Sequence, residues 1–511
     1  MGVIAKQSIR GTFVTYLGVA IGAFTTFVVL THFLTEEEIG LTRVLVEAAT
    51  MLSGLAQLGT SASILRFYPY FKDEEHHDHG FFFWTLVVPL VGFLIFCLLY
   101  LALQVPVKGY FEQNSKLFND YYYFVLPLAF CLVYMTIFES NANVLLKIVV
   151  PKFVREVLVR VLSLAVYVLY GLRVLSLDGF VIAFCGVYAV AMLVDLVYLF
   201  RMKRISLKPD RAFLTKPLRK DYALYTLFLV VGAVAATITP FLNTFFVSGM
   251  LGLKTTGVFT IAVFIASVVE VPFRSLGAIA QPHISQAVKD NDIGQVNDLC
   301  KTVSLHQLLV GGLLFFLIWA NIDVIYDVLP NGDRYRDGKW VVFFFGLYKL
   351  VYSTLNVGAT VLNYSKKYYF SLIFTFLMTG MGIAFNLWLI PRFGMVGSAM
   401  ATLLANLLYY ALMLGFNRWV IKTNLFSWKQ LVVLALVGVL FALDALWTRY
   451  LTPFAYRWVA NGFWAGLLNA VVKSVVWLAL SAAIVYRLKI SLSVNDLINR
   501  VLRVLRIRPD K

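Results

Sequence analysis

The stretch Arg201 to Asp221, RMKRISLKPDRAFLTKPLRKD, decides how the chain is organised. It contains eight Lys or Arg and only two Asp, and its two prolines interrupt any continuous helix. Residues 1–200 before it and 222–418 after it are largely apolar. A short cationic loop between apolar spans stays on the cytoplasmic side of a membrane, because Lys and Arg resist translocation. We therefore interpret 201–221 as a cytoplasmic basic linker between two halves of a membrane protein.

The composition requires a lipid environment. Of 511 residues, 60% are hydrophobic and only 14% are charged, against roughly 25% charged residues in soluble domains. At about 20 residues per crossing, the apolar runs provide about fourteen transmembrane helices. We expect an all-α polytopic membrane protein without a cleavable signal peptide. The four cysteines form no CxxC pair, so no disulfide framework is expected.

The linker and the apolar runs divide the chain into five regions. We predict a six-helix half at 1–200, the linker, a second six-helix half at 222–418, two additional helices at 419–490 and a tail at 491–511. The tail reads as a basic amphipathic helix on the inner leaflet. Lys and Arg are about three times as numerous in the segments expected inside as in those expected outside. This bias predicts that both termini are cytoplasmic.

Glycines and short polar turns indicate close helix packing and an internal repeat. Gly18-x-x-x-Gly22 in the first span is typical of helices that pack closely. The turn that ends at Gly40, with Lys72-Asp73 one span later, is echoed by Gly257 and Lys289-Asp290. Six spans per half preserve orientation, so we predict parallel repeats related by an axis along the membrane normal, as in many alternating-access transporters.

Several function classes are excluded by what the sequence lacks. No GxxxxGK[ST] segment is present, so ATP is not hydrolysed through a P-loop. The outer loops are too short to form a catalytic domain, which argues against a glycosyltransferase or polymerase and predicts that the protein is not an enzyme. The net charge of +17 follows the membrane topology, so we expect no nucleic-acid partner.

Two regions resemble a known family. The segment from Lys6 to Tyr70, with its LTEEEIGL turn and LGTSASILRFYPYF exit, and the segment from Asn356 to Thr402 are similar to bacterial polysaccharide (O-antigen-type) flippases. These belong to the multidrug/oligosaccharidyl-lipid/polysaccharide exporter superfamily. The resemblance covers nearly the whole chain, including fourteen spans arranged as six, six and two.

The resemblance implies a flippase of the bacterial inner membrane. Its expected substrate is a polyprenyl-diphosphate-linked oligosaccharide, moved between leaflets for surface polysaccharide biosynthesis. The expected partners are this lipid-linked oligosaccharide and membrane lipids. Other membrane proteins of polysaccharide assembly are a further expected class of partner. No cofactor is expected, and coupling to H⁺ or Na⁺ is left open. The alternative is a multidrug/cation antiporter of the same superfamily, with Glu47 or Glu270 as the proton site.

Charged residues within the spans are candidates for function, because an ionised group at mid-bilayer is costly. Each could also be structural: Glu270 and Arg274 as a self-neutralising pair, Arg43 with Glu47 four residues on, Arg66 as a lipid anchor. Glu139 either pairs with a neighbouring span or binds the coupling ion, and Lys473 either marks a wet groove or is structural. The predicted substrate-binding residues are Arg43, Arg66, Arg274 and Lys349, and the predicted ion-coupling residues are Glu47, Glu139 and Glu270.

The cluster Asp73-Glu-Glu-His-His-Asp-His79 has ligand types that metals prefer. Its ligands are crowded into one short loop, so we interpret it as a solvated cytoplasmic turn and predict no metal site.

Overall fold

The computed structural model describes residues 3–73, 76–202, 208, 210, 213, 215–453, 462–491, 494–496 and 499. All regular elements in these residues are helical, which confirms the all-α fold class. Eleven helices among them are long and apolar enough to cross a membrane. The chain forms two compact units, Met1–Ile261 with Thr379–Ser398, and Ala262–Met378 with Ala399–Lys511. The predicted boundaries of the halves, and the number fourteen, stay predictions.

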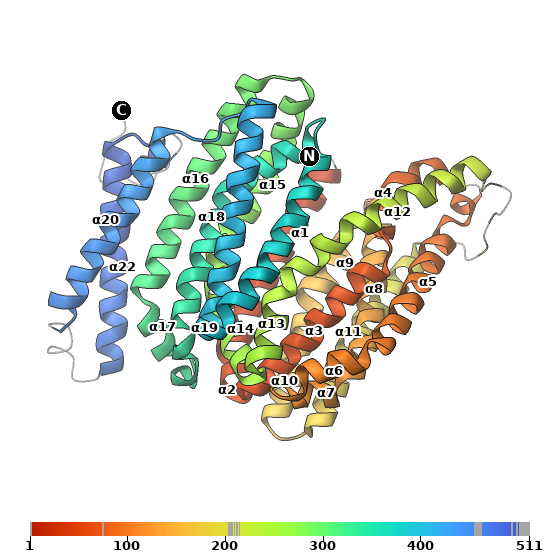
Figure 1. Cartoon of the computed structure of the whole chain (residues 1–511), viewed down its shortest axis with the longest axis horizontal. Coiled ribbons are helices and arrows are strands. Elements are labelled where there is room, and N and C mark those ends of the chain that lie inside the picture. Colours follow the sequence, from red (N-terminus) through yellow and green to blue (C-terminus); the bar gives the residue numbers. More distant parts are fainter. Residues whose placement is uncertain are drawn as a thin grey trace. The chain divides into compact units, whose positions relative to one another are not determined.

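The first unit contains the helices of the N-terminal part of the chain (Figure 1). They are α1 (Val3–Phe24), η1 (Thr25–Leu30), α2 (Thr31–Phe33), α3 (Glu36–Ala56), α4 (Thr60–Phe71), η2 (His77–Gly80), α5 (Phe81–Ala102), α6 (Gln104–Glu112), α7 (Lys116–Asp120), η3 (Tyr122–Phe124), α8 (Val125–Val144), α9 (Val149–Phe153), η4 (Val154–Leu158), α10 (Val159–Gly171), α11 (Leu177–Arg201), α12 (Lys216–Ile238), η5 (Thr239–Phe241), α13 (Leu242–Leu251) and the start of α14 (Leu253–Ser267).

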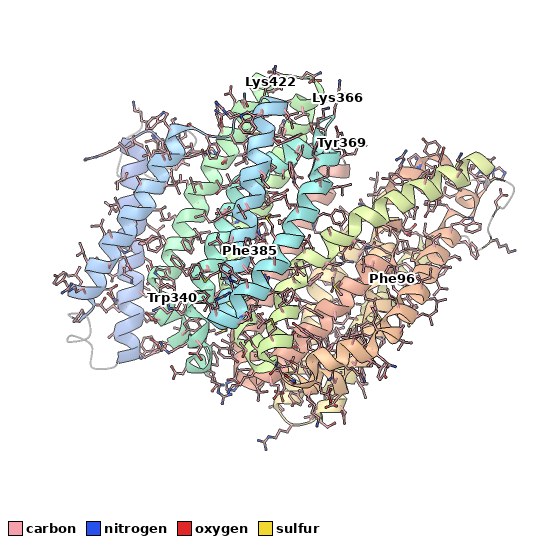
Figure 2. All side chains as sticks on the ribbon, in the orientation of Figure 1. Phe96, Trp340, Lys366, Tyr369, Phe385 and Lys422 are labelled. Carbon is pink, nitrogen blue, oxygen red and sulfur yellow. The ribbon has the colours of Figure 1, made fainter. Side chains whose placement is uncertain are left out.

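The second unit contains the end of α14 and most of the later helices. They are η6 (Val268–Glu270), α15 (Val271–Lys289), α16 (Ile293–Ala320), α17 (Ile322–Val328), η7 (Gly332–Gly338), α18 (Lys339–Tyr364), α19 (Tyr369–Phe416, shared with the first unit), η8 (Asn417–Ile421), α20 (Trp428–Tyr450) and α22 (Gly462–Arg487). Figure 2 labels Lys366 and Lys422 at one end of this unit and Trp340 toward the other. This placement agrees with Lys366 and Lys422 lying in loops on one side of the membrane.

The long element α19 doubles back on itself. Its backbone leaves the helical conformation at Gly394, where φ is 57° and ψ is −140°. The Ser398 hydroxyl then donates to Asn386 Oδ1 at 2.8 Å, although a straight helix would separate them by about 18 Å. A Cβ on Gly397 would lie 2.3 Å from the carbonyl oxygen of Leu389, so only glycine allows the two arms to approach this closely.

The predicted close packing at Gly18 and Gly22 is confirmed. A Cβ on Gly18 would lie 2.5 Å from the carbonyl oxygen of Glu156, and one on Gly22 would lie 2.1 Å from Arg160 Nη1. Arg160 Nη1 also donates to the carbonyl oxygen of Gly18 at 2.7 Å. Small residues on α1 therefore let η4 and α10 approach its backbone.

The predicted repeat has a reciprocal contact at its first signature. A Cβ on Gly40 would lie 2.1 Å from the carbonyl oxygen of Leu253, and one on Gly257 would lie 1.9 Å from that of Glu36. The two relations share one offset, since 257 minus 40 and 253 minus 36 are both 217. Lys72-Asp73 and Lys289-Asp290 are separated by the same offset. The starts of α3 and α14 are thus equivalent positions of two repeats.

Two sequence predictions fall largely on residues outside the described ranges. Only residues 201, 202, 208, 210, 213 and 215–221 of the basic linker are described, and only 491, 494–496 and 499 of the tail. The amphipathic helix proposed for the tail stays a prediction.

Candidate functional site

The principal charged site of the second unit joins Glu270 to Lys349. Glu270 ends η6 at the junction between α14 and α15, whereas Lys349 lies in the middle of α18. The Lys349 ammonium donates to Glu270 Oε2, and only 17% of the lysine side chain and 12% of the glutamate side chain are exposed. Pairing reduces the cost of holding both charges at membrane depth.

Aromatic rings surround the Lys349 ammonium. Its Nζ lies 5.3 Å from the centre of the Tyr348 ring and 5.8 Å from those of Phe345 and Tyr352. At this range the ring faces attract a cation. The site therefore holds a positive group beside the Glu270 carboxylate and several aromatic rings.

Sequence reasoning had placed Arg274 beside Glu270. Arg274 belongs to α15, but its side chain lies outside the described part of the structure. Among the described residues Glu270 forms an ion pair with Lys349, 79 positions along the chain. The predicted roles of Glu270, Arg274 and Lys349 stay predictions.

A second charged pair lies in the first unit on α3. Arg43 and Glu47 form an ion pair, as their i, i+4 spacing predicts, with 45% of the arginine side chain and 7% of the glutamate side chain exposed. Glu47 lines a cavity of about 260 Å³ together with residues of α3, α5, α6 and the segment 241–245. The lining is mainly Leu, Val and Phe, and its polar side chains are Glu47, Tyr100 and Thr244. This cavity suits an apolar ligand that carries a single polar or cationic group.

The other predicted site residues lie apart from these two pairs along the chain. Arg66, on α4, is exposed and its guanidinium lies 4.1 Å from the centre of the Tyr225 ring. Glu139, on α8, forms an ion pair with Arg155, with 3.0 Å between Glu139 Oε2 and Arg155 Nε, so it pairs with a neighbouring helical segment, one of the two alternatives considered. Arg155 also donates to Thr136 Oγ1 at 2.9 Å.

Lys473 lies in a buried polar network that sequence reasoning did not find. Its ammonium lies 3.2 Å from Asp444 Oδ1 and donates to the carbonyl oxygen of Ala320. Trp477 Nε1 donates to the same Asp444 oxygen at 3.1 Å. The sequence showed no partner for Lys473, and the structure supplies one, because Asp444 of α20 is its counter-ion. The wet groove beside Lys473 stays a prediction.

Two carboxylates in spans were missed. Asp444 could have been found by the rule that singled out Lys473, since it is the one acidic residue of 428–450. Asp195, on α11, is 1% exposed and is within electrostatic reach of Glu139 and Arg155. A lone Asp in an apolar span was the available signal.

The loop between α4 and α5 also gathers titratable groups. Asp73, His76 and His79 each offer a ligand atom, and these atoms lie within 4.8 Å of one another. Their arrangement is considered further below.

Comparison with known proteins now places the chain. A family model described as "Polysaccharide biosynthesis protein" matches residues 8–288, more than half of the sequence. The chain belongs to this family. No curated protein sequence matches it.

Solved structures share the fold of this family member. The lipid II flippase MurJ in an inward closed conformation aligns with a TM-score of 0.69 and 14% identity, covering 94% of this chain and 100% of MurJ. An inward-facing multidrug resistance MATE transporter of the MOP superfamily aligns with a TM-score of 0.61 and 15% identity, covering 83% and 98%. A MOP superfamily transporter from Pyrococcus furiosus gives 0.55 and 14%, covering 83% and 98%. The fold is shared with transporters and flippases, and the eleven long apolar helices of the described residues agree with a multi-pass membrane protein.

Proposed function

We propose that the protein is a flippase that moves a polyprenyl-diphosphate-linked oligosaccharide across the bacterial inner membrane by alternating access, for surface polysaccharides of the O-antigen type. The membership in the polysaccharide biosynthesis family and the fold shared with MurJ support a lipid-linked substrate. We expect both termini on the cytoplasmic side. The observation that carries the proposal is the Glu270–Lys349 pair, whose side chains are 12% and 17% exposed, with its surrounding rings.

The pair suits a diphosphate because Glu270 neutralises the Lys349 ammonium until another anion replaces the carboxylate. Without substrate, Glu270 compensates Lys349. A diphosphate that reaches the site supplies more negative charge than one carboxylate, and protonation of Glu270 would release the ammonium to it. This exchange provides a route for H⁺ coupling. The polyprenyl chain would stay in lipid.

The proposal is tested by complementation in a host whose O-antigen flippase gene has been deleted. We expect the wild-type chain to restore surface glycan and the double variant E270Q/K349M to leave lipid-linked repeat units on the inner leaflet. The matched control D444N/K473M removes another buried pair of the same type. Absence of rescue by wild-type protein of normal abundance, in hosts with different glycans, would refute the proposal.

The cavity of the first unit favours a second candidate, a multidrug/cation antiporter. An apolar, aromatic cavity with one carboxylate, Glu47, suits a lipophilic cation. Efflux of a cationic dye, abolished by Glu47→Gln and insensitive to E270Q/K349M, would establish this function. Surface glycan rescued by the wild type without dye efflux would exclude it.

A further inference from the structure

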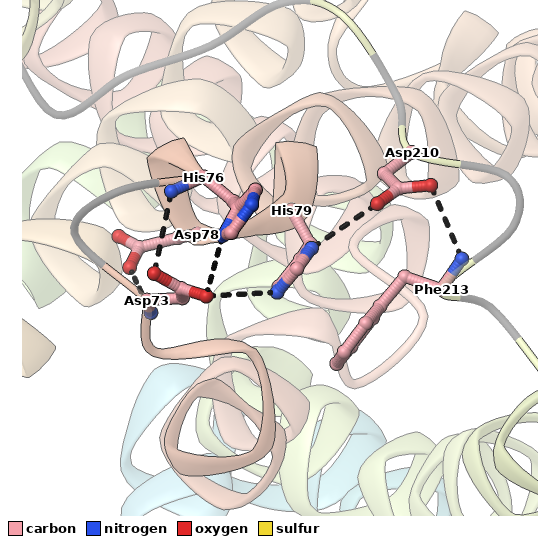
Figure 3. Close-up of polar contacts among 6 residues, drawn as sticks. All are labelled: Asp73, His76, Asp78, His79, Asp210 and Phe213. Atoms are coloured by element: carbon pink, nitrogen blue, oxygen red, sulfur yellow. Dashed lines mark hydrogen bonds and ion pairs between the residues drawn. The ribbon is translucent and has the colours of Figure 1, made fainter.

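The loop between α4 and α5 meets the basic linker in a compact cluster of carboxylates and imidazoles (Figure 3). His79 Nδ1 lies 3.1 Å from Asp210 Oδ2, and the backbone N–H of Asp210 donates to the carbonyl oxygen of His79 at 3.3 Å. The His79 ring also stacks on Phe213 with 3.8 Å between ring centres. Two residues of the linker thus fix the orientation of one imidazole.

Three potential ligand atoms lie close together at the Nε2 side of His79: Nε2 itself, Asp73 Oδ2 and His76 Nδ1. Asp73 Oδ2 lies 2.9 Å from His76 Nδ1 and 3.3 Å from His79 Nε2. Zinc held at bond lengths of about 2.0–2.2 Å separates tetrahedral ligands by about 3.3 Å. The observed spacings, all within 4.8 Å, are close to this value. To share an ion with His79, the exposed His76 ring would have to turn out of its present stack, in which the two rings are 7° from parallel.

The two ring nitrogens of His79 each face a carboxylate, and this arrangement favours a cation between Nε2 and Asp73. A neutral imidazole carries one N–H, and its other nitrogen has a lone pair. If Nδ1 of His79 donates to Asp210, then Nε2 directs its lone pair at the Asp73 carboxylate. A lone pair opposite a carboxylate is unfavourable unless a cation lies between them. The alternative, a doubly protonated His79, is distinguished by the experiment below.

The local backbone holds this arrangement before any ion arrives. Asp78 Oδ1 accepts from the backbone N–H of Asp73 at 2.9 Å, and Asp78 Oδ2 accepts from the Tyr68 hydroxyl at 3.3 Å. Asp78 is 8% exposed and its φ is 53°, in the left-handed region. These hydrogen bonds of Asp78 hold the turn in place, which reduces the conformational entropy that the coordinating residues lose when an ion binds.

We propose that Asp73, His76 and His79 form a binding site for a divalent transition-metal ion of the Zn²⁺ class. Two imidazoles and one carboxylate are a ligand set that such ions favour, with water completing the coordination on the exposed side of His76. Asp210 holds the Nδ1–H of His79 from outside the ligand set, as second carboxylates do in many zinc sites. This revises our interpretation of the segment as a solvated turn.

Metal binding would tie the α4–α5 loop to the linker. Because Asp210 belongs to 201–221, an ion on His79 strengthens a contact between two segments that are 131 positions apart. The site thus provides a regulatory connection to the linker that is independent of the transport site.

The test is Zn²⁺ binding to the full-length protein in lipid nanodiscs after treatment with a chelator. We expect one Zn²⁺ per chain at micromolar zinc, and Co²⁺ should give the visible absorption of a four-coordinate site. D73N and H79A should each weaken binding at least tenfold and remove the Co²⁺ band. D210N, which keeps all three ligands, should weaken binding by about ten- to a hundredfold.

The matched control is His283→Ala, which removes an exposed histidine of α15 and should leave binding unchanged. Wild-type protein that binds no Zn²⁺ would overturn the site, and the doubly protonated His79 would then account for the contacts. Wild-type affinity in D73N and H79A would also overturn it.

The connection to the linker is measured by limited trypsin digestion. Zn²⁺ should slow cleavage within 201–221 severalfold in the wild type and not in D210N. Equal rates with and without bound Zn²⁺ would refute the connection.

Discussion

Lys349 and Lys473 are two ion-paired lysines in helices of the same unit, the first partly buried and the second buried, and their surroundings differ. Lys473 contacts Asp444 and a backbone carbonyl, while Trp477 donates to the same carboxylate, so polar groups fix both partners. Lys349 contacts Glu270 and is otherwise surrounded by aromatic rings. Lys473 donates to a backbone carbonyl besides contacting its carboxylate, which suits it to joining helices. We expect Lys349, whose other described contacts are aromatic rings, to exchange its counter-ion. Depth in the membrane alone does not distinguish the two roles.

The largest expected effect is a difference in flipping rate between variants of the Glu270–Lys349 pair and variants of the Asp444–Lys473 pair. We expect E270Q/K349M to lower the rate of lipid-linked glycan flipping at least tenfold, because the anion loses its cation. D444N/K473M should retain flipping within about twofold per folded molecule. Accumulation of inner-leaflet repeat units measures both. Equal loss in the two double variants would remove the distinction.

Removing one partner of the structural pair should reduce stability. Lys473→Ala leaves the Asp444 carboxylate, which is 13% exposed, with Trp477 as its neutral donor among the described residues. We expect this to lower the free energy of unfolding by about 3 kcal/mol. Thermal unfolding in detergent measures the loss. D444N/K473M is the control, since removing both charges should restore most of the stability. A melting temperature unchanged in Lys473→Ala would mean that the pair contributes no stability.

A smaller effect tests the directed contacts around Asp444. Trp477→Phe keeps an aromatic ring but removes the N–H that donates to Asp444, and should cost about 1 kcal/mol. The same melting assay detects it, with Trp464→Phe as control because that indole is 58% exposed. Greater loss in Trp464→Phe would argue against the network.

The smallest effect is expected where the charge is kept. Lys349→Arg retains a cation that can contact both a carboxylate and aromatic rings, so flipping should stay within about threefold of wild type. Lys349→Gln, whose side chain is uncharged, should lower the flipping rate as much as the double variant E270Q/K349M does. Activity that is retained in Lys349→Gln would show that the positive charge is dispensable.

Short-range features of the sequence predicted much of the fold. Gly18 with Gly22 and the pair Arg43–Glu47 depend on spacing along one helix, and the structure contains the contacts that they predict. The echo of Gly40 at Gly257 predicted a repeat, and only the structure revealed the contact between the two turns. The helical membrane fold followed from composition. These features are encoded within a few turns of helix, so a single sequence reveals them.

The pairings between distant helices could not be predicted in this way. Glu270 and Lys349 are separated by 79 positions, and Lys473 finds Asp444 on another helix. Which helix faces which depends on packing across the bundle, and periodicity on one helix contains no information about its neighbour. Asp195 and Asp444 each stand alone in an apolar run, and their local sequence does not indicate a partner.

The reciprocal contact at Gly40 and Gly257 has the form of an isologous interface, in which the same patch appears on both sides. Interfaces of this kind ordinarily join two identical subunits. A half-length ancestor carrying one such glycine would have closed the same contact with a second copy of itself. Duplication and fusion of its gene would then have turned a homodimer into a single polypeptide, after which each half was free to acquire its own charged residues.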